Sequence, residues 1–139
     1  MREMAIHELD PQVLELYNLA CYVSSRAYAP YSDFRVGAAI LTGQGGVFCG
    51  VNVENASYGL TCCAERNAIF TAIAVEGIMS IQYIAVYVEH KSAAPCGACR
   101  QVIAEFGKDA HIVFSAGDKV IVASLGELLP THFASPNRI

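Results

Sequence analysis

Two short cysteine motifs constrain the fold of this chain more than any other feature of its sequence. They are Thr61-Cys62-Cys63-Ala64-Glu65-Arg66 and Pro95-Cys96-Gly97-Ala98-Cys99-Arg100. Three thiolates, from Cys63, Cys96 and Cys99, would fill three corners of a tetrahedral zinc site and leave the fourth open. An open corner is what separates catalytic zinc from structural zinc. We therefore expect a fold that brings the two motifs together around one zinc ion.

An open corner on zinc has a chemical use. Water held there has its pKa lowered from 15.7 towards ~7, which makes hydroxide available at neutral pH. Glu65, two residues after Cys63, is the expected proton carrier. Cys62 allows two interpretations, because it either closes a four-cysteine structural site or packs as a small apolar side chain. We favour packing, because neighbouring residues on a helix point about 100° apart, so Cys62 would not point at the same ion as Cys63.

The charge of such a site needs compensation. Three thiolates and a hydroxide around Zn²⁺ carry a net negative charge, which weakens the hydroxide as a nucleophile. Arg66 and Arg100 each follow a proposed ligand, so they are candidates to hydrogen bond the sulfur atoms. The alternative is that both are solvated surface arginines.

Composition and charge narrow the classes of function. The chain has 139 residues, which we expect to form one domain over residues 1–139. A net charge of -4 indicates no nucleic-acid or anionic-membrane partner. The first ten residues lack the apolar segment of a secretory signal, and no run of 18 apolar residues occurs, so we expect a cytoplasmic protein. Only 16% of residues are charged, against ~25% typically, so we expect surface buried against other subunits.

The six cysteines allow two other interpretations. A disulfide framework is disfavoured, because reducing compartments rarely sustain structural disulfides. A thioredoxin-like redox pair at Cys96 and Cys99 leaves Cys63 and Glu65 unexplained.

Periodicity and turn signals predict alternating helices and strands. The expected helices cover residues 11–26, 62–75 and 96–106, followed by a helical turn at 124–129. The expected strands cover residues 36–41, 47–53, 81–88, 111–115 and 120–123, and the first two and last two form hairpins. Thr61 is the expected N-cap of the second helix. The prediction is an α/β fold with a mixed five-stranded sheet, in which both cysteine motifs lie at helix N-termini that stabilise thiolates.

Four motifs in a fixed order extend from the residues just before the first hairpin to the third helix. They are Tyr31-Ser32-Asp33-Phe34-Arg35-Val36-Gly37-Ala38-Ala39, Asn52-Val53-Glu54-Asn55-Ala56-Ser57-Tyr58-Gly59, Cys63-Ala64-Glu65-Arg66 and Pro95-Cys96-Gly97-Ala98-Cys99-Arg100-Gln101-Val102. In these motifs the chain resembles the homotetrameric zinc-dependent cytidine deaminases of the cytidine and deoxycytidylate deaminase family. The last two also match the three-cysteine variant of the zinc nucleobase deaminase signature. The resemblance covers residues 28–133.

The resemblance implies a three-layer α/β/α fold and hydrolytic deamination in pyrimidine salvage. Cytidine and deoxycytidine would become uridine and deoxyuridine with release of ammonia, through attack of zinc-activated hydroxide at C4 with Glu65 as proton shuttle. It implies one zinc per subunit and a homotetramer with shared active sites. The implied substrate-binding residues are Asn52 and Glu54 for the ribose, Ala64 (by its backbone N–H) and Phe34 for the base, and Phe133 reaching into a neighbouring subunit's site.

Some residues depart from the family pattern or allow a simpler interpretation. Cys62 stands where the family commonly has an aliphatic residue, and the tail after Phe133 is short. Phe34 and Phe133 are alternatively ordinary core or interface aromatics, and Glu54 a solvated charge.

Two rival functions remain open at this point. One is a zinc-stapled binding protein with a four-cysteine site, which would have no use for Glu65. The other is a deaminase for a modified cytosine nucleoside, such as a nucleoside antibiotic, whereas the Asn52-x-Glu54-Asn55 motif favours plain nucleosides. We expect a free nucleoside substrate, because an acidic chain lacks the Lys/Arg surface that binds phosphates.

Overall fold

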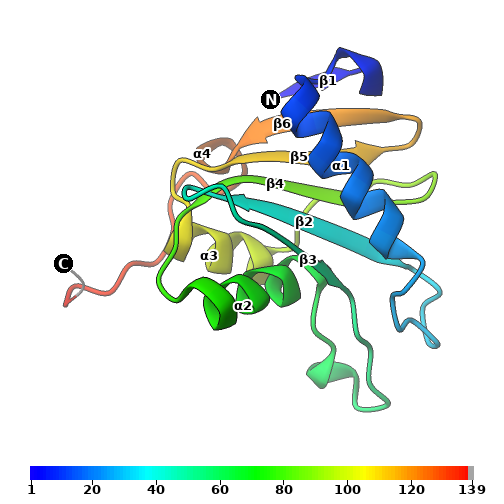
Figure 1. The fold of residues 1–139 in the computed structure, drawn as a ribbon. Coiled ribbons are helices and arrows are strands. Elements are labelled where there is room, and N and C mark those ends of the chain that lie inside the picture. The colour runs from blue at the N-terminus through cyan, green and yellow to red at the C-terminus, as the bar shows by residue number, and fades with distance from the viewer. Residues whose placement is uncertain (138–139) are drawn as a thin grey trace.

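The computed structural model describes residues 1–137 of the chain. One sheet has the strand order β1-β6-β5-β4-β2-β3, and helices cover both of its faces (Figure 1). The strands are β1 (Arg2–Met4), β2 (Val36–Thr42), β3 (Val47–Val51), β4 (Ile81–Val88), β5 (His111–Ala116) and β6 (Lys119–Ser124). The α-helices are α1 (Pro11–Ser24), α2 (Ala64–Glu76), α3 (Gly97–Phe106) and α4 (Leu125–Leu128). β4 and β5 are parallel, and the other neighbouring strands are antiparallel.

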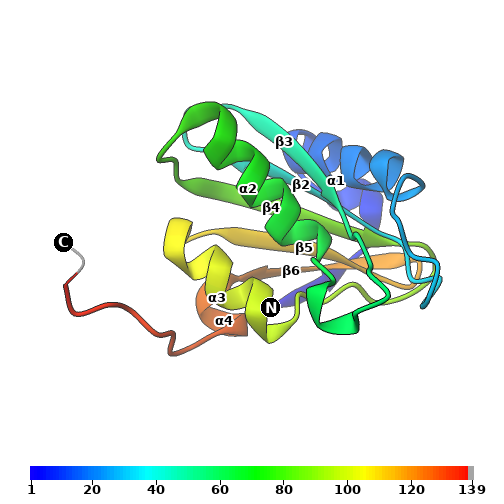
Figure 2. The same cartoon turned by 90° about the horizontal axis from the view of Figure 1, so that it is seen from below.

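The core lies in two layers, one on each side of the sheet. α1 packs Leu16 and Tyr17 against Ala39 and Ala85 on one face. α2 and α3 cover the other face, as the view from below shows (Figure 2). Every residue of β2 is buried, because this strand is covered on both faces. The expected three-layer α/β/α architecture is confirmed.

The sheet has six strands, whereas the sequence predicted five. The additional strand is β1, which pairs antiparallel with β6 at the edge of the sheet. It has three residues, of which Met4 is the buried one. Such a short edge strand contains no alternation of apolar and polar residues that would reveal it in the sequence.

The predicted start of the second helix was wrong by two residues. α2 begins at Ala64 with Cys63 as its N-cap residue, and Thr61 does not cap it. The reason is that Cys62 and Val53 exchange two backbone hydrogen bonds of 3.0 Å, which keeps the chain extended up to this point. Cys62 therefore lies outside the helix.

The topology places the two cysteine motifs at one edge of the sheet. β2 is antiparallel to both β3 and β4, so β3 and β4 run in the same direction. α2 follows β3 and α3 follows β4, and both helices therefore begin near the carboxyl ends of these strands, where α/β proteins commonly bind ligands. α2 also lies very close to β3, because a Cβ atom on Gly50 would come within 2.4 Å of the backbone of Ala64 and Ala68.

None of the helices within residues 1–137 has the length and apolar character that crossing a membrane requires.

Candidate functional site

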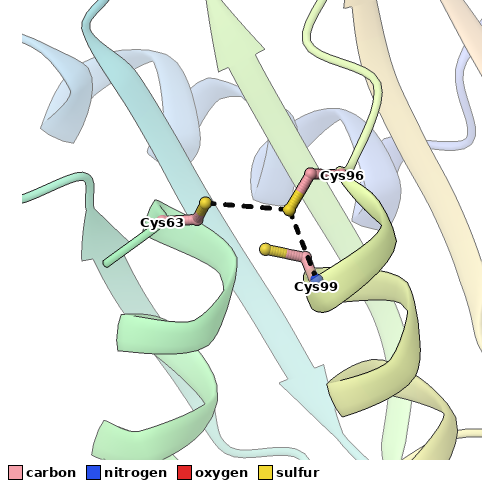
Figure 3. A group of neighbouring side chains, drawn as sticks. All are labelled: Cys63, Cys96 and Cys99. Carbon is pink, nitrogen blue, oxygen red and sulfur yellow. Dashed lines mark hydrogen bonds between the residues drawn. The ribbon is translucent and has the colours of Figure 1, made fainter. Parts of the chain in front are cut away.

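Three cysteine side chains converge where α2 and α3 begin. Cys63 is the N-cap residue of α2, Cys96 is that of α3, and Cys99 lies in the first turn of α3. Their sulfur atoms all lie within 4.8 Å of one another. The Sγ atoms of Cys63 and Cys96 are 3.9 Å apart, and the backbone N–H of Cys99 donates to Cys96 Sγ at 3.5 Å (Figure 3).

This spacing fits a tetrahedral zinc ion. Zn–S bonds of 2.3 Å at tetrahedral angles place two sulfur atoms about 3.8 Å apart. The Cys63–Cys96 separation is close to that value. Within residues 1–137, these three cysteines are the one set of three or more His, Cys, Asp or Glu side chains arranged to hold a metal ion. Cys62 is not among them, and Cys99 is fully buried while Cys96 is exposed.

The surroundings favour a thiolate at Cys63. The pKa of this thiol is lowered to about 5, first by a hydrogen bond from Cys99 and then by Arg66. The donating thiol of Cys99 has its pKa raised by the same contact. A terminal guanidinium nitrogen of Arg66 donates to Cys63 Sγ at 3.4 Å, so Arg66 does contact a sulfur atom as expected.

Arg100, the other arginine that was a candidate to hydrogen bond a cysteine sulfur atom, has different partners. Its Nε donates to the carbonyl of Pro95 at 2.8 Å, and its terminal nitrogen donates to the carbonyl of Leu128 at 2.7 Å. The guanidinium thus joins the start of α3 to the end of α4, and its hydrogen bonds go to backbone carbonyls.

Glu65 lies in the first turn of α2 and is only 5% exposed. Burial is the main reason why its pKa rises to about 7, and the charge of Cys63 raises it further. Hydrogen bonding with its own backbone and with the Cys99 side chain acts in the opposite direction and lowers the pKa. A carboxyl that titrates near neutral pH can both accept and release a proton under working conditions. Ala64 precedes it as the first residue of α2, where its N–H has no acceptor within the helix.

Asn52 and Glu54 lie just beyond the end of β3, because the strand predicted to reach residue 53 ends at Val51. The Asn52 side chain accepts from the N–H of Val36 at 2.8 Å and donates to the carbonyl of Phe34 at 2.7 Å. Its amide therefore holds the backbone on both sides of Arg35. Asn52 is buried, with 7% of its surface exposed.

The carboxylate of Glu54 binds the same loop a few residues closer to the N-terminus. It accepts from the backbone N–H groups of Tyr31 and Ser32 at 3.0 and 3.2 Å, and also from the Ser32 hydroxyl. The pKa of Glu54 is lowered, mainly by that hydroxyl. In this structure the polar atoms of Asn52 and Glu54 both hold the 31–36 loop. Ser32 belongs to a motif seen in the sequence, but no role was predicted for it.

The two aromatic residues of interest have different environments. Phe34 is half-buried against the core, and the ammonium group of Lys91 lies 5.6 Å from the centre of its ring. Phe133 is 76% exposed and belongs to the segment that follows α4 and extends away from the sheet (Figure 1). The Gln101 side chain binds the backbone of Phe133. This contact too was absent from the sequence prediction.

Two hollows of the single chain are lined by different sets of residues. One of about 210 Å³ is lined by Tyr31, Ser32, Glu54, Tyr58 and Thr61. A larger hollow of about 690 Å³ involves the start of β4, the end of α3 and His132, and none of the three cysteines lines it.

The comparisons with known proteins agree with this geometry. The family model described as "Cytidine and deoxycytidylate deaminase zinc-binding region" matches residues 11–116. The cytidine deaminase of Halalkalibacterium halodurans is 58% identical over 113 residues, which cover 78% of this chain and 84% of that protein. A probable cytidine deaminase of Dictyostelium discoideum is 45% identical over 115 residues, covering 81% and 78%. The crystal structure of cytidine deaminase from Burkholderia pseudomallei superposes with a TM-score of 0.79 at 48% identity, covering 90% of this chain and all of that one. The chain therefore belongs to the cytidine and deoxycytidylate deaminase family.

Proposed function

We propose that this protein is a zinc-dependent cytidine deaminase that converts cytidine and deoxycytidine into uridine and deoxyuridine, with release of ammonia, in pyrimidine salvage. One observation supports this proposal more strongly than any other. Three cysteine sulfur atoms at zinc spacing lie beside Glu65, a buried carboxyl whose pKa is close to neutral. A structural zinc site has no use for such a carboxyl, and the family relationship supports the same conclusion.

Cys63, Cys96 and Cys99 are the residues that would hold one zinc ion per chain. The ion, when bound, supplies an activated water at neutral pH. Arg66 offsets part of the negative charge of the three thiolates through its hydrogen bond to Cys63 Sγ.

Glu65 moves protons in this proposal. It accepts a proton from the attacking water and delivers it to N3 of the pyrimidine, and then assists protonation of the departing amine at C4. Water and the nucleoside are thereby converted into ammonia and the uracil nucleoside. The N–H of Ala64 donates to the base, and Phe34 packs against the ring.

Asn52 and Glu54 would bind the ribose of a free nucleoside. A carboxylate accepts hydrogen bonds from sugar hydroxyls and repels a phosphate in the same place. Two like charges 4 Å apart repel by ~4 kcal/mol at an effective dielectric of 20, or roughly a thousandfold in binding. The substrate class that fits this carboxylate is a nucleoside without phosphate.

The proposed enzyme is a homotetramer in which Phe133 completes a neighbouring subunit's site. Large apolar side chains exposed on the single chain support burial against other subunits. They include Leu60, Phe70, Val75, Ile78 and Phe133, which are 50–93% exposed. We also propose that the enzyme works in the cytoplasm, because a three-thiolate zinc site is best preserved in a reducing compartment.

Metal analysis combined with a cytidine turnover assay tests the core of this proposal. The purified protein should contain one zinc per chain and release ammonia from cytidine. Glu65→Gln should keep its zinc and lose several orders of magnitude in kcat, because the amide cannot carry the proton. Near-normal turnover in this variant would remove Glu65 from the mechanism, and zinc without any turnover in the native protein would favour the structural-zinc alternative.

A substrate panel tests the assignment of the ribose site. Cytidine, deoxycytidine, cytidine monophosphate, a cytosine-containing single-stranded oligonucleotide and a nucleoside antibiotic with a cytosine base are assayed side by side. The two plain nucleosides should give the highest kcat/KM. Comparable values for either phosphorylated substrate would show that Glu54 does not have the proposed role, and preference for the antibiotic would identify the rival deaminase. Sedimentation of the active enzyme tests the tetramer, which an active monomer would exclude.

A further inference from the structure

The segment that follows α4 is attached to α3 at two successive points. The guanidinium of Arg100 binds the carbonyl of Leu128, where α4 ends. Five residues farther along, the side-chain amide of Gln101 donates to the carbonyl of Phe133 at 2.9 Å and accepts from its N–H at 3.2 Å. In both ribbon views the segment leaves the fold next to α3 and α4 (Figures 1 and 2).

The two bonds from Gln101 reach both polar backbone atoms of a single residue. This is the pattern by which two opposed residues of antiparallel strands hold each other, here with a side chain in place of one strand. Fixing the N–H and the carbonyl fixes the direction in which the Cα–Cβ bond of Phe133 points. The ring itself remains 76% exposed. The structure therefore contains an exposed aromatic ring on a backbone that is held in place.

We propose that Gln101 is a positioning residue, whose side-chain amide sets the direction in which Phe133 presents its ring to the nucleoside site of a second subunit. The inference rests on the proposed function, in which Phe133 completes that site. Glutamine suits this task because one planar group offers both a donor and an acceptor, whereas glutamate at neutral pH only accepts and leucine does neither.

The position of Gln101 in α3 adds a second element to this inference. The N-terminal end of the same helix carries Cys96 and Cys99. A helix is rigid over one turn, so α3 fixes two proposed zinc ligands of its own site and the Phe133 backbone together. α3 thereby sets the position of two zinc ligands of its own site relative to Phe133, which is proposed to enter the site of a second subunit.

Kinetics of the full-length, zinc-loaded enzyme test the inference through four variants, namely Gln101→Leu, Gln101→Glu, Phe133→Ala and the Gln101→Leu/Phe133→Ala double variant. Gln101→Leu loses both hydrogen bonds, which is expected to lower kcat/KM for cytidine roughly tenfold, mainly through KM. Gln101→Glu keeps the acceptor and should lose less. The double variant should match Phe133→Ala alone, because residues that act through each other are not additive. Zinc content, thermal midpoint and sedimentation should be unchanged in Gln101→Leu.

A matched control is Gln12→Leu, which makes the same substitution at an exposed position of α1 on the other face of the sheet. It should leave the kinetics unchanged. If Phe133→Ala has normal kinetics, the proposed role of Phe133 is wrong, and the inference about Gln101, which depends on it, is wrong too. If Phe133→Ala is impaired but Gln101→Leu is normal, the positioning role alone is overturned. Additive losses in the double variant, or a Gln101→Leu protein that loses zinc, stability or its oligomer, would also overturn it.

Discussion

Replacing Gly50 by alanine tests how strongly the proposed catalytic activity depends on the close packing of α2 against β3. Gly50 lies in β3, opposite the first turn of this helix. An added Cβ would lie 2.4 Å from the carbonyl oxygen of Ala64 and 2.4 Å from the nitrogen of Ala68. Both are backbone atoms, so no side chain can rotate to relieve the contact. An ordinary contact begins at 3.4 Å, so the helix must recede from the strand by about 1 Å.

The expected loss of activity is larger than the expected loss of stability. Forcing an extra carbon into a packed interior costs about 1–3 kcal/mol, against a typical stability of about 5–15 kcal/mol, so Gly50→Ala should still fold. However, the first turn of α2 carries Glu65 and follows Cys63 directly. A displacement of about 1 Å at reacting groups lowers the rate roughly a hundredfold. We expect kcat for cytidine to fall by about that factor.

The assay compares kcat per mole of zinc-loaded protein with the thermal midpoint in three variants. Gly37→Ala is the control for stability, because its Cβ would meet the carbonyl oxygen of Ala20 in α1 at 1.9 Å, on the opposite face of the sheet. It should lose at least as much stability as Gly50→Ala and keep its kcat. Gly97→Ala is the neutral control, since nothing lies within 4 Å of its added carbon. Normal turnover in Gly50→Ala, or an equal loss of kcat in Gly37→Ala, would refute the reasoning.

Three further substitutions test individual contacts. Cys62→Ala should keep both zinc and activity because Cys62 lies outside the sulfur cluster, and loss of zinc would show that the wrong cysteine was assigned. Arg66→Gln should weaken zinc binding 10- to 100-fold in a chelator competition, since it removes the hydrogen bond to Cys63 Sγ; unchanged affinity would contradict this role. Ser32→Ala should raise the pKa of Glu54 in an NMR titration, because the Ser32 hydroxyl is the largest cause of its lowering. The lowered pKa of Glu54 in the folded state contributes stability that is fully present above the unfolded pKa and is lost as the pH falls through the folded pKa. Ser32→Ala should therefore lose stability above the unfolded pKa, and the difference from the native protein should vanish at lower pH. An unmoved pKa of Glu54 would contradict the assignment.

Most of the fold was predictable because its elements differ in the period of their apolar residues. The nearly continuous apolar run at residues 36–41 indicated a strand that pairs with the next one as a hairpin, and β2 (Val36–Thr42) does pair antiparallel with β3. Gly77 ends α2 with a positive φ of 76°, as a helix-terminating glycine does. β1 escaped prediction because pairing with β6 creates it, and pairing partners are not visible in three residues of sequence.

The candidate site was predictable only where residue types alone determine the chemistry. The spacing of Cys96 and Cys99 and the carboxylate after Cys63 indicated the cluster, because few other sites use that combination. The start of α2 was misplaced, since nothing local reveals that Cys62 pairs with a residue nine positions earlier. The partners of Arg100 were equally hidden, because a guanidinium next to a ligand can reach a sulfur atom or a carbonyl.

Both aromatic rings proposed to contact the nucleoside are held through their backbones by side-chain amides. Asn52 holds the carbonyl of Phe34, and Gln101 holds both polar atoms of Phe133. One amide follows a strand and the other lies on a helix, so rigid elements set the position of each ring. Immobilising a flexible side chain or loop on binding costs roughly 0.5–1.5 kcal/mol per group. A site whose aromatic residues are anchored beforehand avoids part of that cost. Asn52 and Gln101 are therefore expected to contribute to nucleoside affinity, although neither is predicted to contact the base.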